Sequence, residues 1–423
     1  MSSSVPALRG RGDDDNEMAA VNEADVHRDL EDQSSDAQLD RVASLPLELS
    51  SDIFTQALPK SPDMRASCTL LIVCHAWNEI ALAMPSLWNT ITDAGIPPMK
   101  FPTVLRLWLG RGDSYPLSLS IRQDMGWASL AMMANALRKH APRLQSLDML
   151  FVYLERGTTF PQFDALQSLT LRGEKDRIVS LTTSLDMLHL APNLVECNFV
   201  DVNYADGEDV QPWTSSSLRH LRLDTGVGDE FRNPISSHIL RHLTLPSLRT
   251  LRMRERNDQG MLIDFLTRSL PPLRTLQFRS PVLTHTVVEI ARMCPFLEEL
   301  HVTLFGRVSD MFEVLATNPD ILPELRSITI CDVVQLRNVY EHVLDFLRNR
   351  AIAKTLRIIV EELGSLNEDR FCDRAIYTQF RKFHAAGINI HIGLPGINFF
   401  SMELDELEAR ETVEDYRRRL LQH

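Results

Sequence analysis

The side chains that could perform chemistry in this sequence are few and widely spaced. His238 and His242 stand four residues apart in segment 234–243, whose pattern predicts a helix, and imidazoles at that spacing can share one zinc ion. No cysteine or carboxylate stands at a useful interval beside them, so we expect no metal site. Phosphate-loop, dinucleotide-binding, nucleophile-elbow and His-Glu-x-x-His motifs are absent from the sequence. We therefore predict a protein that is not an enzyme and needs no metal or other cofactor.

Composition restricts the remaining classes of function. Acidic residues outnumber basic ones by 57 to 44, and the formal net charge of −13 argues against broad affinity for nucleic acid or for anionic membranes. No apolar run reaches the roughly 20 residues that a bilayer-spanning helix needs. The six cysteines form no Cys-x-x-Cys pair, and Cys68, Cys74 and Cys294 suit small buried positions. A reducing compartment, cytoplasm or nucleus, is expected.

The N-terminal arm carries most of the excess acid. Residues 1–40 hold eleven acidic side chains and three arginines, a net charge of −8, and no aromatic residue. Such a segment buries too little apolar surface to offset the entropy cost of ordering it. We predict a disordered acidic arm over residues 1–41, with an interaction or phosphorylation tail as the alternative.

A short helical module is expected over residues 42–92. Pro46 suits the first turn of a helix, where its missing N–H costs nothing, and Glu48 follows where a negative charge suits the helix dipole. Pro59 ends this helix, and two further apolar segments follow. Three short helices cannot cover all of these apolar side chains, which indicates that part of the module's surface binds a partner.

The order of motifs in this module resembles a known family. Leu45, Pro46 and Leu49 precede an Ile-Phe pair, then Val-Cys-x-x-Trp, then Leu-Trp. This order is similar to the F-box, and segments 105–109 and 116–121 are similar to the continuation seen in F-box proteins of mushroom-forming fungi. The resemblance implies that the module binds a Skp-type adaptor and, through it, a cullin. The residues that it assigns to adaptor binding are Leu45, Pro46, Leu49, Ile53, Phe54, Val73, Cys74 and Trp77.

An irregular repeat runs over residues 141–361. The pattern Leu-x-x-apolar-x-apolar recurs at intervals of 22 to 30 residues, and in six of eight occurrences a proline stands two residues before the leucine. Proline ends the preceding helix and favours extended backbone in its neighbour, so each occurrence marks the step from a helix to a strand. The repeat leucines are Leu144, Leu166, Leu194, Leu218, Leu248, Leu273, Leu297 and Leu325.

Short strands that alternate with helices at this interval predict parallel strands in a solenoid. The arrangement resembles leucine-rich repeats, but the Asn or Cys that this family places after each strand is missing, so we expect repeats of unequal pitch. The predicted fold class is α/β: an all-α F-box module, a linker over residues 93–140 and an irregular leucine-rich-repeat-like solenoid. Helices between the strands are expected at 128–140, 178–190, 234–243, 262–270, 284–294, 310–316 and 335–348.

The C-terminal residues 362–423 are expected to cap the solenoid. Ser365 begins a possible capping box for a helix that ends at Gly387, and residues 389–392 predict a last strand. A charged helix is expected over residues 402–421.

Basic side chains recur on one side of the predicted strands. Residues between the apolar positions of a strand point away from the core, and parallel neighbours lie about 4.8 Å apart, so these side chains should stack into a stripe. Arginine binds carboxylate and phosphate groups bidentately, which predicts an acidic or phosphorylated target segment. The alternative is a solvated face whose arginines pair with Asp224, Glu255 and Glu299. The residues assigned to target binding are Arg172, Arg222, Arg252, Arg254 and Arg279, and the same alternation adds His220, Gln277 and His301 to this side.

These features together predict a non-catalytic substrate-recognition subunit of a Skp–cullin–F-box ubiquitin ligase. The module would bind the adaptor and the repeats would bind the target protein, so that tethering raises the effective concentration of target lysines. The alternative is an adaptor-bound F-box scaffold protein that acts outside a ubiquitin ligase. A hydrolase in an irregular α/β domain is a third class, which no motif favours.

Overall fold

The described residues of this protein divide into two compact units. The computed structural model describes residues 45–57, 64–93, 95–112, 115–150, 160–174, 178–204, 210–224, 236–254, 259–305, 307–331, 333, 339–350, 353–359, 374–394 and 397–398. The helical unit comprises those within Met1–Ser61 and Ala66–Met84, and the sheet unit those within Pro62–Arg65 and Pro85–His423. The predicted arm at 1–41, Ser365 and the predicted helix at 402–421 lie outside the described residues.

Aromatic packing holds the helical unit together. Phe54 is fully buried, and its ring centroid lies 4.9 Å from that of Trp77. Cys74 is the N-cap of the last helix, where its Sγ accepts a hydrogen bond from the backbone N–H of Trp77 at 3.5 Å. The helices of this unit are α2 (Leu47–Ala57), α3 (Met64–Val73) and α4 (His75–Leu82).

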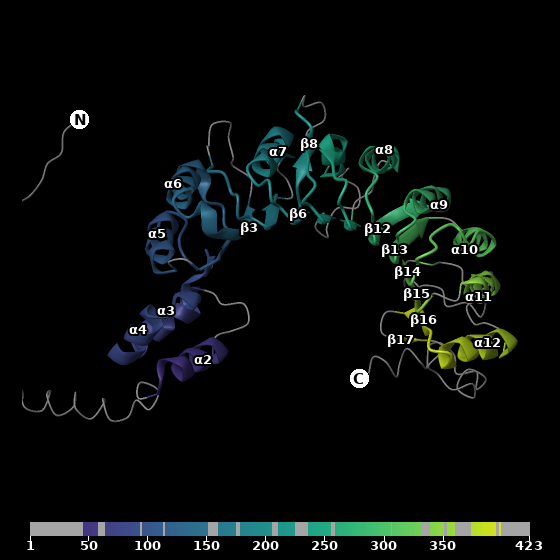
Figure 1. Ribbon diagram of the computed structural model, residues 1–423, viewed down its shortest axis with the longest axis horizontal. Helices are drawn as coiled ribbons and strands as arrows, with labels where there is room; N and C mark the ends of the chain where they lie inside the picture. The colour runs from purple at the N-terminus through teal and green to yellow at the C-terminus, as the bar shows by residue number, and fades with distance from the viewer. Residues whose placement is uncertain are drawn as a thin grey trace, which may run out of the picture. The chain divides into compact units, whose positions relative to one another are not determined.

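One thirteen-stranded sheet runs through the sheet unit (Figure 1). Neighbouring strands are parallel, except that the last two form an antiparallel pair. In spatial order the strands are β1 (Thr90–Thr92), β2 (Leu117–Ile121), β3 (Leu144–Leu150), β4 (Ser168–Arg172), β6 (Glu196–Val200), β9 (His220–Asp224), β11 (Thr250–Met253), β12 (Thr275–Leu283), β13 (Glu299–Phe305), β14 (Ser327–Cys331), β15 (Thr355–Ile359), β16 (Asn389–Leu394) and β17 (Ile397–Asn398). Two small parallel pairs join β5 (Ile178–Val179) to β7 (Asn203–Tyr204) and β8 (Trp213–Thr214) to β10 (Leu243–Thr244).

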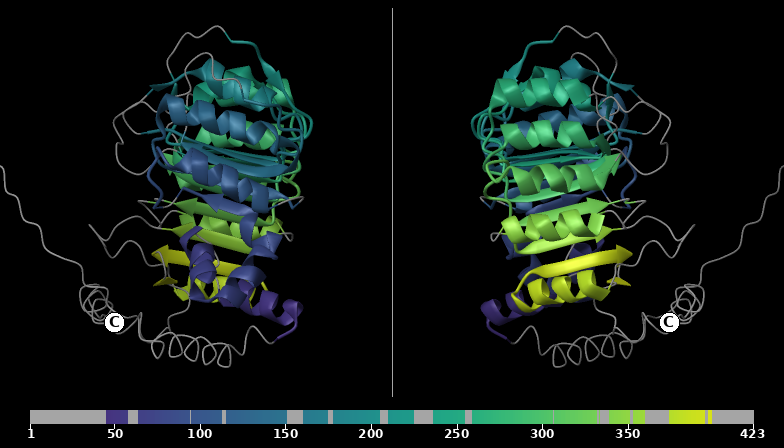
Figure 2. Two further views of the ribbon diagram at one scale, coloured as in Figure 1. Left: turned by 90° about the vertical axis from the view of Figure 1, so that its left-hand side faces the viewer. Right: turned by 90° about the vertical axis from the view of Figure 1, so that its right-hand side faces the viewer.

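Helices cover one face of this sheet (Figures 1 and 2). The strand residues that point toward the helices are buried, whereas most of those between them are half-buried or exposed on the other face, which we call the open face. The α-helices are α5 (Phe101–Arg111), α6 (Gly126–Arg138), α7 (Leu181–His189), α8 (Gln259–Ser269), α9 (Thr284–Met293), α10 (Val308–Thr317), α11 (Val339–Asn349) and α12 (Arg374–Ala385), and the 3₁₀ segments are η1 (Pro85–Trp88), η2 (Ala141–Arg143) and η3 (Ser236–His242).

The repeat leucines anchor the strands as the sequence predicts. Each from Leu166 to Leu325 stands two residues before its strand, and all eight are buried. The prediction of a mixed α/β, solenoid-like arrangement of parallel strands is thereby confirmed. Gly387 follows α12 with a positive φ of 96°, as expected for the residue that ends a helix.

A continuous backbone ladder links the starts of the strands. The carbonyl of Arg219 accepts hydrogen bonds from Arg249 N (2.8 Å) and Thr250 N (3.0 Å), and the carbonyl of Arg249 accepts from Arg274 N (2.8 Å) and Thr275 N (3.0 Å). The same double acceptance recurs at Gln167, Val195, Arg274, Glu298 and Arg326. The ladder fixes the register of one strand against the next without an Asn side chain.

The sheet begins earlier in the chain than the sequence suggests. Residues 93–140, expected to be a linker, contain α5, β2 and α6, and β2 pairs with β3 in the sheet. Trp88, expected to close the helical module, belongs to the sheet unit, where its ring packs edge-on against that of Trp108 at 4.8 Å. The predicted module over 42–92 therefore ends at Met84, because Trp88 is buried beside α5.

Arginine side chains bind the free carbonyl groups at helix ends. Arg143, which follows α6, donates to Leu109 O (2.5 Å) near the end of α5, and Arg268 of α8 donates to Leu240 O (2.5 Å) in η3. The last carbonyls of a helix have no partner inside it, and a guanidinium offers five N–H donors. These contacts therefore join the end of one helix to the end of the next.

Arg350 makes the most extensive contact of this kind. Its side chain is buried, and burial lowers the pKa of its guanidinium, while the charge of nearby Asp320 opposes that shift. The group donates hydrogen bonds to one carbonyl in the last turn of α10 and to three carbonyls in the loop that follows. They are those of Leu315 (3.2 Å), Asn318 (2.9 Å), Ile321 and Leu322 (2.9 Å).

Replacing Arg350 should destabilise the sheet unit. Arg350→Met keeps an apolar stem but removes the charged donor from all four carbonyls. Those of Asn318 and Leu322 keep a backbone donor, whereas those of Leu315 and Ile321 lose theirs. We therefore expect a loss of about 3 kcal/mol in the free energy of unfolding. Thermal unfolding followed by circular dichroism should show a fall in Tm of roughly 6 °C or more. Arg326→Met, at a half-exposed arginine, is the control and should change the stability by less than about 0.5 kcal/mol. An equal Tm for both variants would contradict the role given to Arg350.

Candidate functional site

Strand register brings residues that are far apart in the sequence into rows on the open face. Arg222 of β9 lies opposite Arg252 of β11, and Arg252 lies opposite Gln277 of β12. Parallel neighbours are spaced by about 4.8 Å, so side chains in one row touch or face each other. Met253 and Phe278 also pair. Arg254 follows Met253 directly after the end of β11, and Arg279 follows Phe278 within β12.

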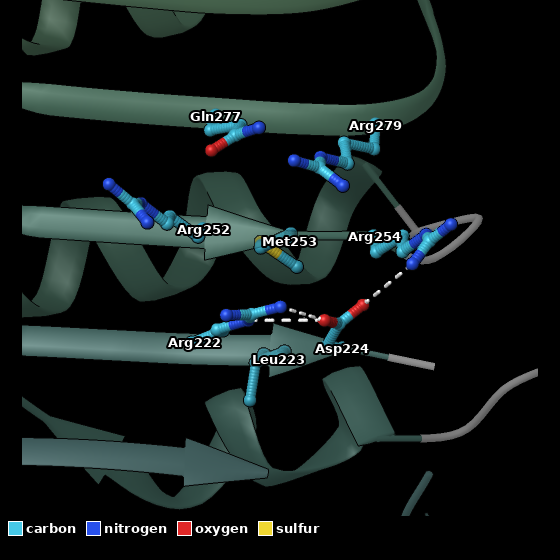
Figure 3. Close-up of a pocket in the computed structure, with 8 residues that line it drawn as sticks. All are labelled: Arg222, Leu223, Asp224, Arg252, Met253, Arg254, Gln277 and Arg279. Carbon is cyan, nitrogen blue, oxygen red and sulfur yellow. Dashed lines mark hydrogen bonds and ion pairs between the residues drawn. The ribbon is translucent and has the colours of Figure 1, made fainter. Parts of the chain in front are cut away.

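Four of the five predicted target-binding arginines meet in one pocket (Figure 3). We call Arg222, Arg252, Arg254 and Arg279 the arginine cluster. The pocket is lined by these four residues with Leu223, Asp224, Met253 and Gln277. Four guanidinium groups against one carboxylate leave three positive charges, because arginine stays protonated in proteins. A locally basic site thus lies on a chain whose net charge is −13.

Asp224 holds two members of the cluster in place. One of its oxygens, Oδ2, accepts from Nε (3.1 Å) and Nη2 of Arg222, and Nη1 of Arg254 lies 3.6 Å from the other, Oδ1. The carboxylate is almost completely buried, so these pairs are shielded from water more than surface pairs are. The alternative in which the arginines pair with nearby acids therefore holds for Arg222 and Arg254.

Arg252 and Arg279 are left to bind something else. Within the part of the chain that the structure describes, neither side chain has a hydrogen bond or an ion pair, and both are exposed (Figure 3). Of the other acids considered for this face, Glu299 accepts a hydrogen bond from Thr275 (3.4 Å), and Glu255 lies outside the described residues. The two guanidinium groups are thus available to an external anion.

Arg172 does not belong to the cluster. It lies on β4, separated from β9 by β6, and its Nε donates to Oδ1 of Asp148 at 2.6 Å. Asp148 also accepts from Arg122 at 3.1 Å. The sequence did not predict that Arg172 pairs with Asp148. The two residues stand 24 positions apart, and only strand register places them side by side.

The helical unit exposes a row of apolar side chains. Leu49 and Ile53 lie one turn apart on one face of α2, and Leu45 lies two residues before that helix. The exposed fractions of Leu45, Leu49 and Ile53 are 36%, 51% and 39%. Val73 at the end of α3 is 52% exposed, and its neighbour Ile72, which belongs to none of the F-box-like motifs, is 82% exposed. A water-exposed row of this kind is typical of a protein-binding surface.

The other residues assigned to adaptor binding differ in their exposure. Pro46 is exposed beside Leu45, whereas Phe54 is fully buried and packs against Trp77. Cys74 caps α4 and is half-buried. Phe54, Trp77 and Cys74 therefore contribute contacts inside the unit. The exposed residues among those assigned to adaptor binding are Leu45, Pro46, Leu49, Ile53 and Val73.

The histidine pair lacks the geometry that its spacing suggests. His238 and His242 lie in η3, a 3₁₀ segment of seven residues rather than an α-helix. A 3₁₀-helix has three residues per turn, so residues four apart point about 120° apart and do not share one side. Among the described residues, no group of three or more His, Cys, Asp or Glu side chains is arranged to hold a metal ion.

A cysteine and a histidine lie in contact on the open face, although no sequence motif predicts this contact. Sγ of Cys331 lies 3.2 Å from Nε2 of His301, on the neighbouring strands β14 and β13. The two residues stand 30 positions apart, and only register joins them. Cys197 and Cys294 are buried, as expected of Cys294, whereas Cys68 is exposed and was wrongly expected in the core.

Comparisons with known proteins add little to this description. No family model matches the chain, and no curated protein matches it. Among solved structures, a protein from Bacteroides fragilis is similar over 70% of this chain and 72% of its own, with 12% sequence identity and a TM-score of 0.33. A TM-score below 0.5 does not establish a shared fold.

Among the described helices, none combines the length and the apolar character that a bilayer crossing requires.

The cysteines should differ strongly in their reactivity. Burial raises the pKa of Cys294 to about 12, and burial together with the charge of Glu196 raises the pKa of Cys197. Because the thiolate is the reactive form, iodoacetamide at pH 7.5 should modify both residues at least about tenfold more slowly than exposed Cys68. Peptide mass spectrometry of the native protein measures the rates, and the same reaction in 6 M guanidinium chloride, which should remove the difference, is the control. Equal rates in the native protein would contradict the burial of these thiols.

Proposed function

We propose that this protein is a non-catalytic substrate-recognition subunit of a Skp–cullin–F-box ubiquitin ligase. The helical unit binds a Skp-type adaptor through the apolar row formed by Leu45, Leu49 and Ile53, and the open face of the sheet binds the target protein. The apolar row carries the proposal, because Leu45, Leu49 and Ile53 stay exposed in a unit that buries Phe54 beside them. The order of F-box-like motifs in the sequence names the kind of partner that would cover this row.

The division of the chain into two units suits such a receptor. The helical unit and the sheet unit each have a buried core of their own, represented by Phe54 in one and by the repeat leucines in the other. Their candidate binding surfaces differ in character, one apolar and the other charged. Two such surfaces select different partners and therefore allow one chain to bring an adaptor and a target together.

Leu49→Glu should abolish adaptor binding. A charge placed in the centre of an apolar interface would be buried without a partner, and we expect the affinity to fall by about a hundredfold or more. Thr55→Glu adds the same charge at an exposed position of α2 away from the row and should change the affinity by less than about threefold. Biolayer interferometry with a purified Skp-type adaptor measures both, and circular dichroism checks that both variants fold. An unchanged affinity of Leu49→Glu would refute the assignment of this surface.

Affinity purification separates the ligase subunit from the scaffold alternative. The tagged full-length chain should retain both an adaptor and a cullin when the protein is a ligase subunit. Recovery of the adaptor without a cullin would favour a scaffold that acts outside the ligase. Recovery of neither would overturn the proposed function.

A further inference from the structure

The pocket of the arginine cluster is lined by four arginines and one carboxylate, so its positive charge is only partly neutralised. Asp224 engages Arg222 and Arg254, which leaves Arg252 and Arg279 exposed and without a partner among the described residues. These two side chains come from the neighbouring strands β11 and β12 and line one pocket (Figure 3). Asp224 thus acts as a positioning residue that fixes one side of the pocket, while the other side offers two guanidinium groups to an incoming anion.

We propose that the arginine cluster binds the phosphate group of a phosphorylated serine, threonine or tyrosine in a target segment. The inference rests on the proposed function, which assigns target binding to the open face. The phosphate oxygens accept hydrogen bonds from the guanidinium groups of Arg252 and Arg279, while Arg222 and Arg254 add positive charge beside them. No covalent step is involved, and the site recognises its ligand by charge and hydrogen bonding alone.

The balance of charge favours phosphate over carboxylate. A phosphate monoester carries a charge near −2 at pH 7 and has three terminal oxygens, so two guanidinium forks can bind it at once. A carboxylate carries one charge and two oxygens, and a single fork satisfies it. The three excess positive charges of the pocket are therefore offset better by one phosphate than by one aspartate or glutamate.

The surroundings favour a single phosphate over a nucleic-acid backbone. Glu196 of β6 and Glu299 of β13 begin strands on either side of the three that carry the cluster, and both are exposed. A polyanion that crosses the sheet would approach these carboxylates and would be repelled by the net charge of the chain. One phosphate on an otherwise uncharged or basic peptide meets the arginines without that repulsion.

A binding measurement on the full-length chain tests the inference. The probes are fluorescein-labelled peptide libraries of identical mixed composition, with phosphoserine, serine or glutamate fixed at the centre, and their binding is followed by fluorescence anisotropy. The cluster variant is Arg252→Gln with Arg279→Gln, which removes two charges and breaks no hydrogen bond or ion pair among the described residues. The matched control is Arg219→Gln with Arg249→Gln, which removes two charges from exposed arginines just before β9 and β11.

We expect the wild-type chain to bind the phosphoserine library more tightly than the other two. The cluster variant should lose about tenfold or more of this affinity, since two charge-assisted contacts are removed, and the control pair should stay within about threefold of wild type. Inorganic phosphate should displace the phosphoserine library from the wild-type chain. A phosphorylated tyrosine library tests whether the same pocket serves the larger side chain.

Several outcomes would overturn the inference. Equal binding of the phosphoserine and serine libraries, no binding of any library, or equal loss in the cluster and control variants would each refute a phosphate site. Equal binding of the glutamate library would replace it with an acidic-segment site. Tighter, cluster-dependent binding of a single-stranded oligonucleotide would replace it with a nucleic-acid site.

Failure of this inference can be told apart from failure of the proposed function. Adaptor affinity is measured on the same cluster and control variants and should match wild type in both. Adaptor binding without phosphoserine binding would remove the phosphate site and leave the receptor role. Phosphoserine binding without adaptor binding would keep the phosphate site and reject the receptor role.

Discussion

The double hydrogen bond at the starts of strands β6, β9 and β11 to β15 is the interaction on which the open face depends. One backbone carbonyl accepts two consecutive N–H groups of the next strand, as Arg249 O does from Arg274 and Thr275, and this fixes both the spacing and the register of the pair. A slip of one residue would turn every side chain of a strand to the opposite face. The buried repeat leucines oppose such a slip, because it would expose them. Arg222 and Arg252 lie side by side for this reason, although neither position has any local signal that links it to the other.

The same bonds keep neighbouring repeats in register although no Asn ladder follows the strands. Backbone groups supply the hydrogen bonds at the strand starts, and arginines such as Arg268 and Arg350 supply them at the helix ends. At one strand end the backbones approach closely: a side-chain carbon on Gly173 would lie 2.1 Å from the carbonyl oxygen of Asp201. Only glycine fits there.

Because these hydrogen bonds do not depend on repeat length, the repeats can differ in length while their strands remain in one sheet.

The sequence predicts those features that depend on local pattern. Buried leucines, the alternation along each strand and the helix end at Gly387 all follow from residue type and spacing, and the structure has them. Strand β2 was missed because no leucine stands two residues before it, although its own alternation is regular. The 3₁₀ form of η3 was missed because a period of three and a period of 3.6 look alike over seven residues.

Features that depend on register between distant residues could not be predicted. The ion pair of Arg172 with Asp148 and the contact of Cys331 with His301 join residues 24 and 30 positions apart. The alternation correctly places these arginines and His301 on one face, but it does not say which acid lies beside which base. The position of the acid defines the candidate site. Asp224 pairs with Arg222 and Arg254, and Arg252 and Arg279 remain available to a ligand.

The two candidate surfaces would bind their partners through different physical interactions. Burial of the apolar row depends on the hydrophobic effect, which moderate salt changes little. Binding of an anion to Arg252 and Arg279 depends on charge at an exposed site, which salt screens over about 8 Å at physiological ionic strength. In the proposed receptor, a rise in salt would therefore weaken a target contact at the arginine cluster more than an adaptor contact at the apolar row. Such a chain would release one partner and keep the other, because the free energy of each contact would come from a separate physical source.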